Sequence, residues 1–357
     1  MKEEMTQKQR TTLATYPIAV FLFFAFLLGA TVFLSHVENK TEQTQVEKHK
    51  NIQKNINQAS IQNQLKTVLA KENNSLKHAT YQPIKKKNFS DLTLENAHAA
   101  IILDVDSGTI LYEKNATQKR SLASITKLVT AMITIDRVRD LNEVVTIPES
   151  VMHIEGTTVG CPTSVICNSE PFHTGEKVYL KDVLRSMLMF SANDAATVLG
   201  VHIAGSEEEF AKLMNARMKE IGAGNTHFCR PSGLEFDADV ESCYSSAYDI
   251  ARAIAHLLQY DKYNVLWDMM RTKEVVFKSV DGKFEHELKN TDRLIGELPN
   301  LVGAKTGFTP RAGYCLAMVT SDANKKHKII SIVLDDYHRF DDVQKMSAWT
   351  FENYVWQ

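Results

Sequence analysis

The order in which strand-like and helix-like segments follow one another along the sequence restricts this chain to few folds. Two short strands are predicted at 98–105 and 109–113, and a block of helical patterns follows them. Three more strands and one closing helix come late in the chain. Strands split around an inserted helical block favour an α+β domain, in which helices flank an antiparallel sheet and part of the helical block forms an inserted subdomain. The helical patterns cover about 124–138, 180–203 with a break near Ser191, 207–221, 246–258 and 341–354, and the late strands 301–308, 313–321 and 328–335.

Charge and composition exclude several classes of protein. The 357 residues carry 41 basic and 43 acidic side chains, a net charge of −2, so no nucleic-acid partner is expected. A hydrophobic content of 44% excludes a wholly disordered chain. The five cysteines contain no CxxC pair, and the 12 histidines show no ligand spacing. The sequence therefore predicts neither a metal site nor a cofactor.

The N-terminal region contains an uncharged apolar run of 17 residues, 18–34. Its length suits a short membrane span, and no A-x-A cleavage site follows it. We expect an uncleaved single-pass anchor at 15–36, with residues 1–14 in the cytoplasm because basic residues precede the run. A cleaved signal peptide and a buried helix are the alternatives. An anchor places the rest of the chain outside the cytoplasm at the cell membrane, and a cleaved signal makes it secreted.

A polar segment, 37–95, follows the apolar run. It is rich in Gln, Asn, Lys and Glu, and its apolar residues recur at a roughly helical spacing without forming clean heptads. We interpret it as a solvated, partly helical stalk, and a weak dimerisation helix is the alternative. Residues 96–357 are predicted to form the folded domain.

The first motif that carries chemistry is Ser124-Ile125-Thr126-Lys127, which leads into the apolar stretch LVTAMITI. Positions i and i+3 of a helix share a face, so Ser124 and Lys127 are neighbours. Burial lowers the proton affinity of a lysine, and a neutral amine beside a serine hydroxyl can act as its general base. Taken alone, the motif is better explained by a serine that caps a helix, with a solvated lysine one turn later.

Two further motifs are built from polar side chains beside apolar segments. Ser191 and Asn193 follow an apolar helix, where a hydroxyl can relay a proton and an amide can hold a substrate backbone. Lys305, Thr306 and Gly307 end an apolar strand, expected at a sheet edge that faces a cleft. There an ammonium and a hydroxyl can bind an anion, and the glycine allows a substrate backbone to approach closely. Each motif alone also fits a helix break or a strand end.

Together the three motifs form a recognised signature. The order S-x-x-K, S-x-N, K-T-G, separated by about 65 and 110 residues, is that of penicillin-binding proteins and serine β-lactamases. Residues 96–357 resemble the serine D-alanyl-D-alanine carboxypeptidases, the low-molecular-mass penicillin-binding proteins. The resemblance extends to the stretches LASITKLVTAMI, FSANDAATVLG and GAKTGFTPRAGYCLA. It implies a β-lactamase/transpeptidase-like fold and a serine hydrolase that removes the terminal D-Ala from peptidoglycan stem peptides.

The resemblance also implies a role for each motif residue. Ser124 would be the nucleophile, Lys127 its base, and Ser191 a relay to the leaving group. Asn193 would hold the substrate backbone, and Lys305 and Thr306 would bind the terminal carboxylate. The backbone N–H groups of Ser124 and Phe308 would form the oxyanion hole, with Gly307 beside them. A β-lactam antibiotic would acylate Ser124 and inhibit the enzyme.

Three alternatives to a carboxypeptidase remain. A D,D-endopeptidase uses the same residues, so the sequence does not separate the two activities. A class A-like β-lactamase needs a deacylating glutamate in an E-x-x-L-N loop, and no such pentapeptide lies between the second and third motifs. A non-catalytic cell-wall binding protein is disfavoured because every motif side chain is present.

The cysteines mark departures from the family pattern. Cys161 and Cys167 bracket an apparent insertion between the first two motifs, and in an exported chain they could form a local disulfide. Cys229 and Cys243 are a second candidate pair. Cys315 lies in an apolar strand and is predicted to be a buried free thiol.

Overall fold

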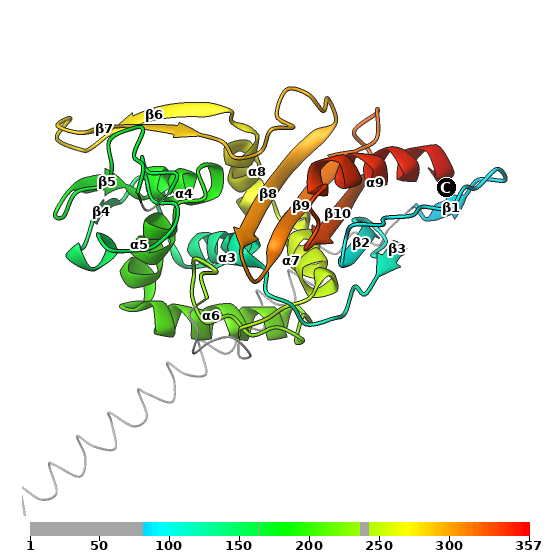
Figure 1. Ribbon diagram of the computed structural model, residues 1–357, viewed down its shortest axis with the longest axis horizontal. Helices are drawn as coiled ribbons and strands as arrows, with labels where there is room; N and C mark the ends of the chain where they lie inside the picture. The colour runs from blue at the N-terminus through cyan, green and yellow to red at the C-terminus, as the bar shows by residue number, and fades with distance from the viewer. Residues whose placement is uncertain (1–80, 164, 236–242) are drawn as a thin grey trace, which may run out of the picture. The chain divides into compact units, whose positions relative to one another are not determined.

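A five-stranded antiparallel sheet is the centre of the fold (Figure 1). The computed structural model describes residues 81–163, 165–235 and 243–357. The strands lie in the order β3-β2-β10-β9-β8, so β8 is an edge strand. Their bounds are Ala99–Asp104 for β2, Ile110–Lys114 for β3, Leu301–Thr309 for β8, Gly313–Ser321 for β9 and Lys328–Leu334 for β10.

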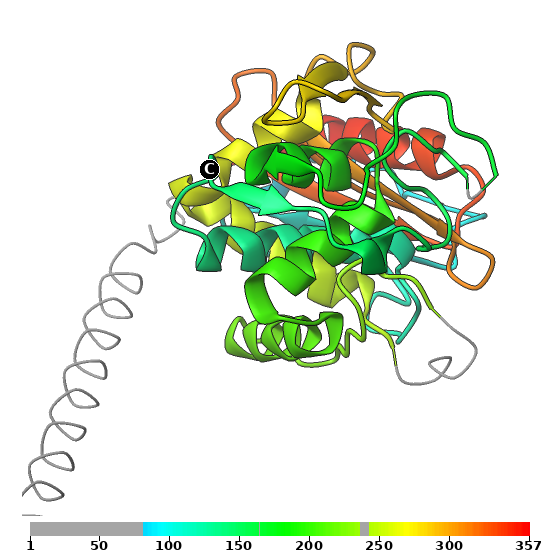
Figure 2. The same ribbon diagram turned by 90° about the vertical axis from the view of Figure 1, so that its left-hand side faces the viewer.

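The inner strands are mostly apolar and buried because both faces of the sheet are covered. In β2, Ala99, Ile101 and Leu103 enter one hydrophobic core, whereas Ala100 and Ile102 enter the other. Successive side chains of a strand point to opposite faces, so each strand contributes to both cores. Helix α9, Arg339–Asn353, packs on β9 and β10 and belongs to the second core; it is drawn in red in Figures 1 and 2. Helices of the inserted block cover the opposite face.

The inserted block is built around α3, Lys127–Arg137, which contacts α4, α5, α6 and α7. Residues 127–134 of α3 are all buried, because neighbouring helices surround its first two turns. A short 3₁₀ turn, η1, Ala123–Thr126, precedes α3 and contacts β8 and β9. The other helices are α4, Leu180–Met189; α5, Asn193–Ala204; α6, Glu207–Glu220; α7, Ala247–Gln259; and α8, Asn264–Arg271.

The predicted α+β class and its elements are confirmed, and smaller elements were missed. The sequence patterns did not predict helix α8 or three two-stranded ladders. One ladder is the hairpin of β6, Glu274–Lys278, with β7, Glu285–Lys289. Another pairs β4, Val144–Thr146, with β5, Lys177–Tyr179. β4 and β5 have only three residues each, and β6 and β7 carry several charged side chains, so the hydrophobic pattern of these strands is weak.

The predicted boundary between stalk and domain at residue 95 is wrong. Strand β1, Pro83–Lys85, pairs with β11, Tyr354–Trp356, and Leu92 and Leu94 are buried beneath α9 in the second core. The domain therefore takes in residues that the polar composition assigned to the stalk. The remaining predictions on the cytoplasmic N-terminus, the anchor and the stalk concern residues 1–80, which lie outside the described residues.

None of the helices within the three described ranges has the length and apolarity that crossing a bilayer requires. Both candidate disulfides are present, Cys161–Cys167 and Cys229–Cys243, and Cys315 is a buried free thiol as predicted. The first disulfide closes a loop between β4 and β5, on the side of the molecule that carries the predicted site.

Candidate active site

Ser124 and Lys127 lie side by side at the start of α3. The turn Ala123–Thr126 is 3₁₀, in which residues i and i+3 eclipse, so the two side chains meet even more directly than on an α-helix. Lys127 Nζ lies 2.7 Å from Ser124 Oγ. It also lies 2.8 Å from Asn193 Oδ1 and 2.6 Å from the carbonyl oxygen of Ser232. Three segments far apart in the sequence therefore hold this one amine.

The surroundings of Lys127 favour its neutral form. The side chain is fully buried, and loss of hydration lowers its pKa well below the usual value for lysine. The charge of Lys305 lowers the pKa further, and that of Asp194 opposes the shift. A neutral amine has a lone pair that can accept the Ser124 hydroxyl proton. The structure thus provides the serine–amine pair that the first motif predicts.

Ser191 lies in the short break between α4 and α5, where it adopts a left-handed backbone with φ +65°. Such a conformation is strained for a residue other than glycine and is often found at functional sites. Its Oγ accepts a hydrogen bond from Lys305 Nζ at 2.8 Å. The expected relay residue is therefore tied to the third motif, whereas Lys127 is tied to Asn193.

Asn193 is the first residue of α5 and is almost fully buried. Its Oδ1 faces the Lys127 amine, and its Nδ2 donates to the carbonyl oxygen of Glu155 at 2.9 Å. The amide has two N–H groups, so it can bind a substrate carbonyl while one of them remains on Glu155.

The third motif lies on the edge strand β8, as predicted. Lys305 is 1% exposed, and its Nζ donates to Ser191 Oγ and, at 3.0 Å, to the Thr306 carbonyl oxygen. Burial, and then the charge of Arg339, lower the pKa of Lys305 to about 7. The Thr306 hydroxyl forms a hydrogen bond of 2.7 Å with the Thr291 hydroxyl. The amine and the hydroxyl of the third motif are therefore held in place by contacts with Ser191 and Thr291.

Gly307 permits β8 to approach the nucleophile. A Cβ atom at this position would lie 2.8 Å from the Leu122 carbonyl oxygen and 3.2 Å from the Ser124 backbone nitrogen. The next residue, Phe308, is half exposed, and its ring packs on Tyr314 with 4.5 Å between centroids. The backbone nitrogens expected to form the oxyanion hole are thus carried by two segments in close contact.

Ser124, Asn193 and Phe308 line a cavity of about 270 Å³, close to the lower end of ordinary ligand pockets (about 300–1,000 Å³). Lys127, Ser191, Lys305 and Thr306 are not among the residues that line it. It contains the nucleophile, Asn193 of the second motif, and Phe308 and Thr309 beyond the third. None of the described residues that line it is charged. The lining residues are Ser124, Gly156, Thr157, Pro162, Thr163, Asn193, Gly233, Leu234, Phe308 and Thr309.

Two groups at the site were not assigned roles from the sequence. Gly233, with φ +76°, packs so closely on η1 that a Cβ would collide with the Ala123 carbonyl oxygen and with Thr126. Arg339 Nη1 donates to the carbonyl oxygens of Gly307 at 2.7 Å and Cys315 at 3.2 Å, which supports β8 from behind. In the sequence, Pro231–Leu234 resembles a stretch of the D-alanyl-D-alanine carboxypeptidases, and no sequence pattern marked Arg339.

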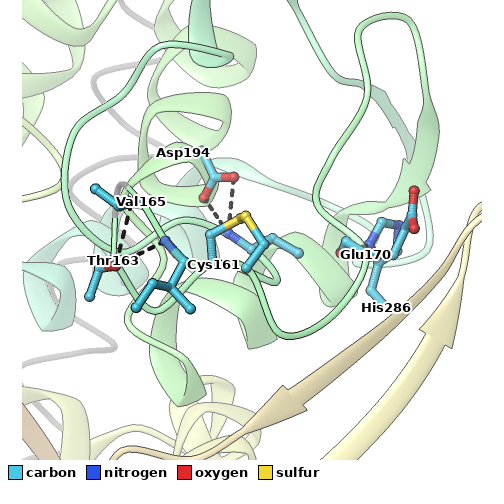
Figure 3. Close-up of a disulfide and its surroundings, with 9 residues drawn as sticks. Cys161, Thr163, Val165, Glu170, Asp194 and His286 are labelled. Atoms are coloured by element: carbon cyan, nitrogen blue, oxygen red, sulfur yellow. Dashed lines mark hydrogen bonds between the residues drawn. A yellow bond between two sulfur atoms is a disulfide. The ribbon is translucent and has the colours of Figure 1, made fainter.

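Pro162 and Thr163 of the Cys161–Cys167 loop line the cavity, and the residues just before this loop are bonded to the second motif. Both carboxylate oxygens of Asp194 lie 3.1 Å from the Val159 backbone nitrogen (Figure 3). The Asn193 backbone nitrogen donates to the Thr157 carbonyl oxygen at 2.7 Å. Burial raises the pKa of Asp194 to about 7. The insertion noted in the sequence is thus part of the cleft.

Comparison with known proteins agrees with this geometry. The chain is 32% identical over 275 residues to the D-alanyl-D-alanine carboxypeptidase DacF of Bacillus subtilis, which covers 75% of this chain and 65% of the relative. It is 30% identical to a D-alanyl-D-alanine endopeptidase of Escherichia coli, over 70% of this chain and 76% of the relative. The chain therefore spans about two thirds to three quarters of the length of these relatives.

Solved structures show the same fold. Penicillin-binding protein D2 of Listeria monocytogenes, solved with ampicillin bound, superposes with a TM-score of 0.60 at 28% identity, covering 73% of this chain and 99% of that one. A D-alanyl-D-alanine carboxypeptidase of Mycobacterium tuberculosis gives a TM-score of 0.64 at 23% identity, over 76% and 98% of the two chains, and supports the fold alone. The family model Peptidase_S11, D-alanyl-D-alanine carboxypeptidase, matches residues 85–338. The chain therefore belongs to the Peptidase_S11 family of D-alanyl-D-alanine carboxypeptidases.

Proposed function

We propose that this protein is a serine D,D-carboxypeptidase that removes the terminal D-Ala from peptidoglycan stem peptides through an acyl-enzyme on Ser124. One observation carries the proposal: a buried amine, Lys127, lies 2.7 Å from a hydroxyl that opens into a cavity. The Lys305 amine of the third motif donates a hydrogen bond to Ser191 Oγ of the second motif. Membership of the family supports the same reaction.

The geometry suggests how acylation proceeds. Lys127 accepts the hydroxyl proton as Ser124 attacks the carbonyl of the penultimate D-Ala. The Ser124 and Phe308 backbone N–H groups stabilise the oxyanion, and such a donor is worth about 3 kcal/mol. The substrate carboxylate binds Lys305 and Thr306.

The remaining steps release D-Ala and regenerate the enzyme. Ser191, held by Lys305, passes its hydroxyl proton to the leaving nitrogen and takes back the proton that Lys127 accepted, so Lys127 is neutral again. Water then hydrolyses the ester on Ser124, with Lys127 again as base. A β-lactam acylates Ser124 by the same route.

The direct test uses the full-length chain in detergent. The protein should release D-Ala from a synthetic stem pentapeptide. After incubation with penicillin, intact-mass analysis should show one adduct, and peptide mapping should place it on Ser124. Ser124→Ala should lose both properties while keeping its thermal unfolding midpoint. Absence of D-Ala release and of any adduct from correctly folded wild-type protein would refute the proposal.

Assays of the same purified protein distinguish the carboxypeptidase from two alternatives, an endopeptidase and a β-lactamase. The endopeptidases of Escherichia coli and Pseudomonas aeruginosa, at 30% and 31% identity, make cleavage of cross-linked peptides the leading alternative. Equal rates on a cross-linked dimer and on a stem pentapeptide would favour it. Rapid, repeated turnover of a chromogenic cephalosporin would instead favour a β-lactamase.

We also propose that the apolar run 18–34 anchors the protein in the cell membrane, with the catalytic domain outside the cytoplasm. The support is the uncharged sequence and the basic residues that precede it. An anchored protein should stay in the membrane fraction through a high-salt wash and keep its full mass. A soluble product that lacks the run would show a cleaved signal peptide.

The pKa of Lys305 predicts how substrate binding varies with pH. The ammonium is present below about pH 7 and is lost above it, and only the charged form attracts the substrate carboxylate. We therefore expect kcat/KM for the pentapeptide to fall above about pH 7, mainly through a rise in KM. A pentapeptide amide, which lacks the carboxylate, should show no such rise. A KM that stays constant to about pH 9 would contradict this role of Lys305.

A further inference from the structure

Residues 155–163, which we call the wall segment, lie between the first two motifs and line part of the cavity that contains Ser124. The residues of the wall segment that line the cavity are Gly156, Thr157, Pro162 and Thr163. The wall segment is thus part of the site, although none of the three motifs includes it.

The wall segment is bonded to the second motif at two points on Asn193. Asn193 Nδ2 donates to the Glu155 carbonyl oxygen at 2.9 Å, and the Asn193 backbone nitrogen donates to the Thr157 carbonyl oxygen at 2.7 Å. The same amide faces the Lys127 amine through its oxygen. The position of the wall segment therefore determines where the Asn193 amide lies relative to the expected catalytic base.

A second stretch, residues 167–176, which we call the supporting segment, contacts the wall segment. The Cys161–Cys167 disulfide joins the two. The Asn168 backbone nitrogen donates to the Gly160 carbonyl oxygen at 2.8 Å. Gly160, with φ +72°, packs so closely that a Cβ atom there would lie 2.6 Å from the Glu170 carbonyl oxygen. The wall segment therefore rests directly on the Glu170 carbonyl group.

A buried histidine of β7, His286, holds the supporting segment at two points (Figure 3). Its Nδ1 lies 2.9 Å from the Glu170 carbonyl oxygen, and its Nε2 lies 2.7 Å from Glu176 Oε1. The other carboxylate oxygen of Glu176 accepts from the His173 backbone nitrogen at 3.0 Å. The carbonyl group on which the wall segment rests is therefore itself fixed by the His286 ring.

The two contacts of His286 require its charged form. A carbonyl oxygen only accepts hydrogen bonds, and so does an ionised carboxylate, so the ring bonds to both only as an imidazolium. Burial lowers the pKa of His286, but the hydrogen bonds to Glu176 and to the Glu170 carbonyl, with the charges of the two carboxylates, outweigh burial and raise the pKa above its usual value. Geometry and electrostatics therefore favour the same protonation state.

The other neighbours of the ring leave this balance to the supporting segment. The rings of Phe172 and Phe277 pack on the imidazole, with 5.3 and 4.7 Å between centroids. Glu285 and Glu287, its acidic neighbours in β7, are exposed on the other face of the strand. The described carboxylates whose charges act on His286 thus both come from the supporting segment.

We propose that His286 is a positioning residue for Asn193: as an imidazolium it fixes the supporting segment, which holds the wall segment to which Asn193 is bonded. This inference rests on the proposed carboxypeptidase function. His286 does not line the cavity and acts only through the two segments. Loss of its proton leaves one ring nitrogen facing an oxygen without a hydrogen between them, so the supporting segment loosens as the pH rises through the pKa of His286.

The decisive variant is Glu176→Gln, which removes the charge and keeps the hydrogen bonds. A glutamine can accept from the His173 backbone nitrogen and donate its amide to a neutral His286 ring. Its contact should therefore persist at every pH. In the wild-type protein, the raised pKa of His286 means that the contact is complete below about pH 6.5 and is lost as the pH rises through the raised value.

Hydrogen exchange of the Asn168 amide, corrected for the intrinsic rate at each pH, reports the contact between the two segments. Its protection should fall about fivefold from about pH 6 to about pH 9 in the wild-type protein, the effect of one lost hydrogen bond, and stay constant in Glu176→Gln. The ratio of kcat values for the pentapeptide, wild type to Glu176→Gln, should fall by about the same factor, and KM should change less. The titration of Lys305 is common to both proteins and cancels in this ratio.

Further variants separate this role from loss of structure. His286→Phe keeps an aromatic ring that can pack on Phe172 and Phe277 but removes both donors, so Asn168 protection and kcat should be low at every pH. His286→Gln should show the same loss, so the test does not depend on one variant folding. The control is His202→Gln, because His202, near the end of α5, is also bonded to a glutamate, Glu143. It should match the wild-type protein in both measurements.

The outcomes are distinguishable from failure of the proposed function. If wild-type protein releases D-Ala and its exchange and kcat profiles are parallel to those of Glu176→Gln, the role of His286 is wrong and the function stands. If wild-type protein neither releases D-Ala nor forms a penicillin adduct, the proposed function fails, and the role of His286 in catalysis fails with it. Losses at high pH that Glu176→Gln abolishes, with the control unchanged, support the inference.

Discussion

Replacing Lys127 by methionine is expected to slow acylation of Ser124 by a penicillin by about 10³-fold, within the range of about 10²–10⁴ typical of a lost general base. Methionine has nearly the shape of lysine without its amine, so the hydroxyl loses its proton acceptor. The fold should persist, because the change removes a desolvated amine from a fully buried position. It also leaves Asn193 Oδ1 and the Ser232 carbonyl oxygen without this partner.

The measurement is the second-order rate of adduct formation, followed by intact mass, together with the thermal unfolding midpoint. Lys212→Met is the matched control, because Lys212 is an exposed residue of α6. Its acylation rate should equal that of the wild-type protein. An acylation rate for Lys127→Met within tenfold of wild type would show that another group accepts the proton.

Gly307→Ala should produce the second large loss, about 10²-fold in acylation rate, through geometry alone. The added Cβ would lie 2.8 Å from the Leu122 carbonyl oxygen, so β8 and η1 must move apart. Movement of this kind displaces the Phe308 nitrogen relative to Ser124, and a misplacement of about 1 Å costs on the order of 10²-fold. D-Ala release should fall in parallel with penicillin acylation, because both use the same oxyanion hole.

Gly224→Ala provides the control for this substitution. A Cβ at Gly224 meets nothing within 4 Å, so the added methyl should leave acylation unchanged. Rates and unfolding midpoints are measured for both variants. If Gly307→Ala acylates at the wild-type rate, close approach of β8 to the nucleophile segment is not required for the reaction.

Much of the fold follows from local patterns in the sequence. The sequence predicted the strands of the sheet and the helices from α3 to α7. Each of these elements is marked by a local pattern, such as an apolar run, a helical spacing of apolar residues or a turn residue, that lies within a few neighbouring positions. The same logic failed for β1, which is polar and became part of the domain only by pairing with β11. Hairpin β6–β7 was not predicted for a similar reason, because its charged residues interrupt the apolar pattern typical of a strand.

In the candidate site too, some contacts follow from local sequence spacing and others only from the tertiary structure. The pairing of Ser124 with Lys127 is a local spacing, and the sequence alone determined it. The bond of Ser191 to Lys305 joins residues 114 positions apart, and that of Lys127 to the Ser232 carbonyl joins residues 105 apart. No spacing rule reaches across such distances. Only the packing of the helical block against β8 decided these partners, because burial and charge at a site depend on every segment that surrounds it.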